Sequence, residues 1–131
     1  MKPFAILKVN SFLLVSIQEE IDDSSLDRLL EELADRISAL RVRGVILDLH
    51  QVDVMDSFMA DSIRKVALML RALEARAIVS GLRGSAVMTL VAFDIDMHDV
   101  EFSLDIEDAI IKLHGWLEGT ARRSITGISP A

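Results

Sequence analysis

Residues 45–63 read VILDLHQVDVMDSFMADSI and join two patterns that decide the fold. The first five residues form an apolar run broken only by Asp48, which is typical of a strand buried on both faces of a parallel sheet. From Ser57 onward apolar residues recur at helical spacing, and that pattern predicts an amphipathic helix. A buried strand that leads into a helix indicates a βαβ crossover and hence a parallel sheet.

The residues before this unit predict a hairpin and a first helix. Residues 4–9 and 12–17 are short apolar runs separated by an Asn-Ser pair suited to a tight turn, so we expect two antiparallel strands. Residues 22–25 offer helix-capping side chains, and leucine and isoleucine residues then recur at helical spacing over 26–40. This segment therefore predicts an amphipathic helix before the buried strand.

The residues after the unit continue the alternation. Residues 77–81 predict the next strand, and a loop at 81–85 leads into a shorter helix. Residues 99–104 alternate as an edge strand does, and Asp105 is suited to cap a last helix. The predicted order is ββαβαβαβα. It implies an α/β fold with a mostly parallel mixed sheet, an antiparallel N-terminal hairpin at one edge and amphipathic helices packed on the sheet.

The length and composition fit one domain. A chain of 131 residues buries roughly two-thirds of the surface that its unfolded form exposes. We expect the domain to cover 1–119 and residues 120–131 to form a flexible tail, because the tail lacks hydrophobic periodicity. The apolar fraction of 51% is high for a soluble domain, so part of it is expected to cover an interface.

Charge and composition exclude several function classes. The net charge of −7 argues against nucleic acid, since neutralising phosphates requires clustered lysine and arginine. No apolar run approaches the roughly 18 residues of a membrane span, and the first residues lack a secretory pattern, so we expect no membrane association and a cytoplasmic location. The absence of cysteine removes disulfides, thiolate metal sites and a cysteine nucleophile.

Asp56 and Ser57 form the main candidate site. They follow the strand at 45–49, and open α/β folds place their sites at the carboxyl edge of the sheet. Both residue types are preferred helix caps, worth about 1 kcal/mol, so the residues alone favour a plain cap. A modified serine and a nucleophile remain open. The nucleophile is the weaker hypothesis, because the glycines of a G-x-S-x-G elbow are absent and only His50 among the histidines falls on the same edge.

Two other clusters carry weaker predictions. The loop GLRGS at 81–85 lacks the G-K-[ST] ending of a phosphate cradle, so its glycines are interpreted as turn residues. Arg83 in this loop is expected beside Ser57, in position to neighbour a phosphoserine, although a solvated loop arginine is the simpler interpretation. Residues 94–99 collect three acids and His98. An acidic connector explains them, and we predict no metal site and no cofactor.

The stretch quoted first resembles the STAS domain family, the sulfate-transporter and anti-sigma-antagonist domains. The family pattern is an apolar strand ending in Asp-Leu, a short connector, an apolar residue and Asp-Ser at the start of a helix. Asp48-Leu49, Val54-Met55 and Asp56-Ser57 match it. The ββαβαβαβα order also fits the family fold. The resemblance covers about residues 4–118.

Within that family the chain resembles the stressosome scaffold antagonists of the RsbS type. Two separated segments carry this likeness, LLVSIQEEIDD at 13–23 and VDVMDSFMA at 52–60. Ordinary anti-sigma antagonists carry a second serine or threonine and then glycine after Asp-Ser, whereas this chain has Phe58 and Met59. That departure favours the stressosome branch over direct control of an anti-sigma factor.

The resemblance implies a non-catalytic scaffold of the general stress response. Ser57 would be phosphorylated by a switch serine kinase, which the scaffold holds with a sensor-bearing STAS co-scaffold in a homo- and hetero-oligomeric assembly. A serine phosphatase would reset Ser57. The implied site residues are the phosphoacceptor Ser57, the helix cap and phosphosite neighbours Asp56, Asp53 and Arg83, and the partner contacts Phe58 and Met59. Asp56 is then expected to cap the helix while Ser57 faces outward.

Two further features of the family are not part of this assignment. The second phosphosite of the co-scaffold is not carried over to Ser24 or Ser25, because acids occupy much of that loop and a cap explains both serines. An alternative function is a STAS module that senses a nucleotide or another small ligand. Its support in the sequence is the GLRGS loop alone.

Overall fold

The computed structural model describes residues 3–18, 21–93 and 100–126. Strands and helices alternate after an N-terminal hairpin, as predicted. The strands are β1 (Phe4–Val9), β2 (Phe12–Ile17), β3 (Gly44–Asp48), β4 (Arg76–Ser80) and β5 (Glu101–Ser103). The helices are α1 (Asp23–Leu40), α2 (Ser57–Ala72), α3 (Gly84–Phe93) and α4 (Ile106–Thr126).

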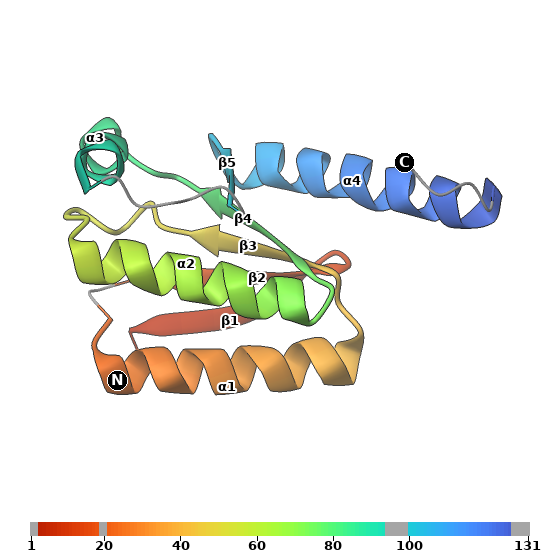
Figure 1. Ribbon diagram of the computed structural model, residues 1–131, viewed down its shortest axis with the longest axis horizontal. Coiled ribbons are helices and arrows are strands. Elements are labelled where there is room, and N and C mark those ends of the chain that lie inside the picture. Colours follow the sequence, from red (N-terminus) through yellow and green to blue (C-terminus); the bar gives the residue numbers. More distant parts are fainter. Residues whose placement is uncertain (1–2, 19–20, 94–99, 127–131) are drawn as a thin grey trace.

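One five-stranded sheet organises the domain, with the strands in sequence order from β1 to β5 (Figure 1). β1 pairs antiparallel with β2, and β2 through β5 pair in parallel. The tight turn between β1 and β2 uses the left-handed backbone of Asn10, at φ 55°, a conformation that asparagine tolerates better than most residues. The predicted hairpin and mixed sheet are confirmed.

Each face of the sheet has its own core. Successive strand residues point to opposite faces, so Val45 and Leu47 pack with α1 and α2 while Ile46 packs with α4. All five residues of β3 are buried, which is why that strand reads as a continuous apolar run. Figure 1 shows α4 apart from α1 and α2, with its last turns running beyond the sheet.

Gly44 lets α4 approach the sheet closely. A Cβ atom at this position would lie 2.8 Å from Cδ1 of Phe12 and 3.2 Å from the methyl groups of Leu113. Both of these side chains are fully buried. The glycine at the start of β3 is therefore required by the packing of the α4 face.

Two predicted boundaries differ from the structure. The last helix continues to Thr126, so residues 120–126 of the expected tail are helical. These residues contain no proline, and a helix that has begun propagates at little cost. The last strand is shorter than predicted, since β5 pairs with β4 over three residues and α4 begins at Ile106. In the described part of the chain no helix is long and apolar enough to cross a bilayer.

Candidate functional site

Asp56, not Ser57, caps the helix that follows β3. Its backbone is extended, with φ −102° and ψ 176°, and its Oδ1 accepts a hydrogen bond from the Met59 N–H at 2.7 Å. Ser57 is the first residue of α2 and is exposed. The geometry gives the two neighbours separate roles, Asp56 as the cap and Ser57 as an exposed residue.

Arg83 ties the loop after β4 to the connector between β3 and α2. Its Nη1 lies 2.9 Å from Oδ1 of Asp53, and its Nη2 donates to the carbonyl oxygen of His50 over 3.4 Å. Both charged side chains are more than half exposed, so the ion pair stabilises the fold by at most about 1 kcal/mol. Arg83 thus lies on the edge that carries Ser57, and its contact with a phosphate there stays a prediction.

Met59, one of the two partner contacts that the resemblance implies, is buried in the structure. The cap sets the start of α2 so that Met59 falls on the stripe facing the sheet, where it is 2% exposed and packs in the main core. Phe58 is half-buried against the same core and keeps part of its ring accessible. The exposure of Val54 was not predicted; this residue is 64% exposed between the buried residues Val52 and Met55.

A buried carboxylate and a histidine form a pair at the same edge, which the sequence analysis did not predict. Asp48 is 4% exposed, and its Oδ1 accepts from the His50 N–H at 3.1 Å. Nδ1 of the His50 ring lies 2.7 Å from the other carboxylate oxygen. Gly81 makes room for the pair, because a Cβ there would lie 2.9 Å from Cβ of His50. The visible clue in the sequence was an acid inside an apolar strand.

A hollow of about 330 Å³ opens beside this pair on the α4 face of the sheet. Its other lining residues are Ser80, Gly81 and residues 104–107. The Ser80 hydroxyl is buried and has no hydrogen-bond partner within the described ranges. In the same part of the chain no hydrogen bond joins Ser57 to His50, whose Nδ1 is already held by Asp48. The structure therefore gives Ser57 no bonded general base.

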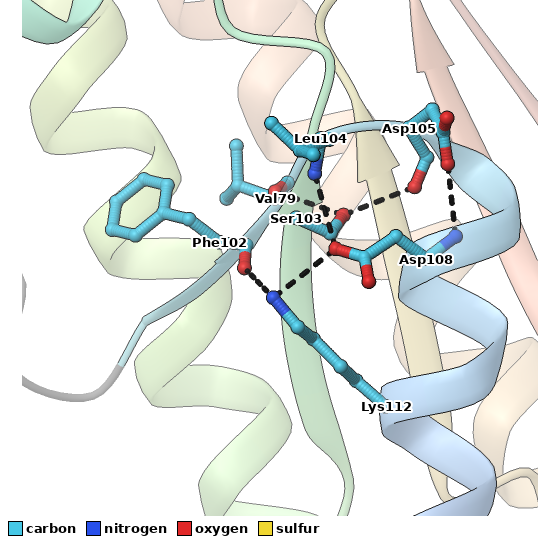
Figure 2. Close-up of polar contacts among 7 residues, drawn as sticks. All are labelled: Val79, Phe102, Ser103, Leu104, Asp105, Asp108 and Lys112. Carbon is cyan, nitrogen blue, oxygen red and sulfur yellow. Dashed lines mark hydrogen bonds and ion pairs between the residues drawn. The ribbon is translucent and has the colours of Figure 1, made fainter.

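The turn between β5 and α4 holds an apolar side chain out at this edge (Figure 2). Asp105 caps α4 as predicted, since its Oδ1 accepts from the Asp108 N–H at 2.9 Å. The Asp108 carboxylate accepts from the Leu104 N–H at 3.2 Å and pairs with Lys112 at 3.1 Å. The hydrogen bond from Lys112, and to a smaller extent the one from the Leu104 N–H, hold the pKa of the Asp108 carboxyl below its usual value. Leu104 is 87% exposed at the tip of this bonded turn.

The cluster of acids with His98 at 94–99 lies outside the described residues. Among the residues that the structure describes, no group of three histidine or carboxylate side chains is placed to hold a metal ion.

Comparison with known proteins places these features in a family. The family model for the STAS domain matches residues 4–109. The RsbT co-antagonist protein RsbRD of Bacillus subtilis (strain 168) is 29% identical over 91 residues, which make up 70% of this chain and 33% of that protein. The chain thus spans about a third of the length of this relative.

Two solved structures have a similar fold. Moorella thermoacetica RsbS, solved as a serine-to-glutamate variant, has a TM-score of 0.75 and 23% identity, with 88% of this chain and 97% of that chain covered. A chain in a solved structure of the stressosome, which is described as a signal integration and transduction hub, has a TM-score of 0.72 and 21% identity. The match covers 86% of this chain and 98% of that chain. At these identities the likeness is one of fold.

Proposed function

Because the chain belongs to the STAS domain family, we propose that it is a non-catalytic, cytoplasmic stressosome scaffold that holds a switch serine kinase. Phosphorylation of Ser57 releases the kinase, and a serine phosphatase reverses the change. The observation that carries this proposal is the exposed Ser57 hydroxyl at the first residue of α2, beside a cap supplied by Asp56. The similarity to RsbS and to RsbRD supports a sensor-bearing STAS co-scaffold as the assembly partner.

The position of Ser57 suits a phosphate. Phosphorylation adds about −1.5 to −2 charges at pH 7 and three strong acceptor oxygens. At an exposed helix N-terminus the backbone N–H groups and the helix dipole favour such a charge by about 0.3 to 1 kcal/mol. The carboxylates of Asp53 and Asp56 oppose it, and the Arg83 guanidinium that pairs with Asp53 reduces that repulsion. These opposing contributions are small, so phosphorylation changes the surface and leaves the fold intact.

The surroundings of Ser57 explain how one phosphate releases a partner. Val54 is exposed and Phe58 is partly exposed on either side of the hydroxyl, which gives the kinase an apolar contact next to acidic side chains. A phosphate buried in that contact would lose its hydration and would meet Asp53 and Asp56 at close range. Burying an unpaired charge costs several kcal/mol. The kinase therefore dissociates when Ser57 is modified.

Phosphate mapping tests the proposal. The chain is incubated with the switch serine kinase and ATP, and the modified residue is identified by mass spectrometry. We expect phosphate on Ser57 and none on the Ser57→Ala variant. Ser85→Ala is the matched control, because Ser85 is an exposed serine in the first turn of the neighbouring helix α3. Phosphate on another residue with Ser57 unmodified would overturn the proposal.

The alternative function is the sensing of a small ligand, and the hollow beside Asp48 and His50 supports it. The hollow is lined by Asp48, Asp105 and Glu107, whose carboxylates would repel the phosphates of a nucleotide. Calorimetric titration of the chain with ATP and GTP separates the two functions. The scaffold predicts no specific heat of binding, and a saturable heat would favour the sensor.

A further inference from the structure

The hollow beside Asp48 and His50 is lined by the buried side chain of Ser80. Ser80 is 1% exposed, and within the described residues its Oγ atom forms no hydrogen bond. Side chains two residues apart on a strand point to the same face, and Ile78 packs in the core cluster under α4. Ser80 therefore points to the α4 face, where the hollow lies. A buried hydroxyl without a partner costs stability, so an occupant that bonds to it would recover that cost.

Asp48 adds a buried carboxylate to the same hollow. It is 4% exposed and follows Ile46, another residue of the cluster under α4, by two positions. Its hydrogen bonds are with the backbone N–H and the ring of His50. Among the residues that the structure describes, no lysine or arginine pairs with Asp48. Each carboxylate oxygen can accept a second hydrogen bond, and a cation beside a buried carboxylate offsets the cost of its burial.

The turn between β5 and α4 forms another wall of the hollow, and Figure 2 shows Leu104 and Asp105 on this turn. Asp105 uses Oδ1 to cap α4. Glu107 is exposed and, in the described part of the chain, forms no hydrogen bond or ion pair. Leu104 and Ile106 make this wall partly apolar. The positive end of the α4 dipole opposes a cation here with about half a charge, which the carboxylates of the lining outweigh.

We propose that this hollow binds a small aliphatic diamine. Asp48 and Ser80 are register partners on β3 and β4, strands about 4.8 Å apart, so one ammonium group can reach both side chains. An ammonium group has three hydrogen-bond donors, which the carboxylate and the Ser80 oxygen accept. The hydrocarbon chain then lies against Leu104 and Ile106, and the second ammonium group lies beside Glu107.

Other occupants match the lining less well. The carboxylates repel an anion such as a nucleotide. A metal ion needs several ligands, and no three histidine or carboxylate side chains in the described ranges are placed to hold one. The hollow lies on the α4 face, and Ser57 begins a helix that packs on the other face. The site is therefore independent of the function proposed for Ser57.

Titration of the full chain with putrescine at constant ionic strength tests the proposal. We expect saturable NMR shifts of the backbone N–H groups at Ser80, Gly81 and residues 104–107, with the Kd measured by isothermal titration calorimetry. Butylamine lacks the second charge and should bind more weakly, and butanediol lacks both charges and should not bind. Magnesium chloride carries the charge of the diamine without its hydrocarbon chain. Magnesium binding as tight as that of putrescine would overturn the proposal.

Matched variants show which groups bind the diamine. Ser80→Ala removes no hydrogen bond from the unbound chain, so the thermal midpoint should stay unchanged while the Kd for putrescine rises about tenfold. Glu107→Gln should raise the Kd about threefold, because an exposed ion pair is weak. Glu118→Gln makes the same change at an exposed position of α4 about 16 Å along the helix and should leave the Kd unchanged. Equal Kd values for Ser80→Ala and the unmodified chain, or shifts spread over the surface outside the hollow, would overturn the proposal.

Discussion

Replacing Asp56 with alanine tests the separation of cap and phosphoacceptor on which the proposed function depends. The change removes the acceptor of the 2.7 Å hydrogen bond from the Met59 N–H and leaves that donor without a side-chain partner. Loss of an N-cap side chain costs about 0.5 to 2 kcal/mol, and loss of a negative charge at a helix N-terminus adds about 0.3 to 1 kcal/mol. We expect the free energy of unfolding to fall by about 1 to 2 kcal/mol.

This loss is measurable as a shift in the thermal midpoint. An unfolding entropy of about 2.1 cal/mol/K per residue over 131 residues converts 1 kcal/mol into about 4 °C. Far-UV circular dichroism should therefore show Asp56→Ala melting about 4 to 7 °C below the unmodified chain. Asp56→Ser keeps an acceptor oxygen and should recover most of the loss.

Two comparisons make the result specific. Asp22→Ala removes the equivalent cap of α1, where Oδ1 accepts from the Ser25 N–H at 2.8 Å, and should cost a similar amount. Ser57→Ala removes a hydroxyl that takes no part in the cap and should change stability by less than about 0.5 kcal/mol. If Ser57→Ala were the more destabilising of the two neighbouring changes, Ser57 and not Asp56 would be the cap.

Three further predictions concern the packing and the charges. Gly44→Ala places a Cβ atom 2.8 Å from Phe12, so urea unfolding should show a loss of about 1 to 3 kcal/mol; an unchanged midpoint would contradict the close packing of α4. Gly81→Ala forces a side chain onto a backbone at φ 81° and against His50, so it should lower stability and shift the His50 ring signals in NMR, whereas Gly84→Ala, with open space around it, should shift neither. The pKa of Asp22 lies below its usual 3.8 because of the Ser25 N–H, so its stabilisation is present above that pH and is lost as the pH falls through the lowered value. The acid-induced loss of stability should be smaller in Asp22→Asn, and parallel pH profiles would contradict this assignment.

The fold was predictable because local pattern and tertiary structure agree in β3. Its residues are buried on both faces, so a continuous apolar run was an accurate sign of a central parallel strand. The end of α4 was not predictable, because residues 120–126 lack an apolar stripe and their helix continues from the packed turns before it.

The site was predictable only in part. Asp56 and Ser57 are both good caps, and only the backbone of the cap residue distinguishes them. The burial of Met59 was not predicted, since one position along a helix changes the face by about 100°. The contacts of Arg43 and Arg76 with the Trp116 ring could not be predicted, because residues far apart in the sequence come together there and no sequence spacing records it.

The decisive measurement for the proposed function is the affinity of the switch serine kinase for the chain before and after phosphorylation of Ser57. Isothermal titration calorimetry measures the Kd for the unmodified chain, for Ser57→Ala and for the phosphorylated chain. We expect the first two to bind alike and the phosphate to weaken binding at least about 30-fold, as for an unpaired charge in a contact. Equal Kd values for the unmodified and phosphorylated chains would contradict it.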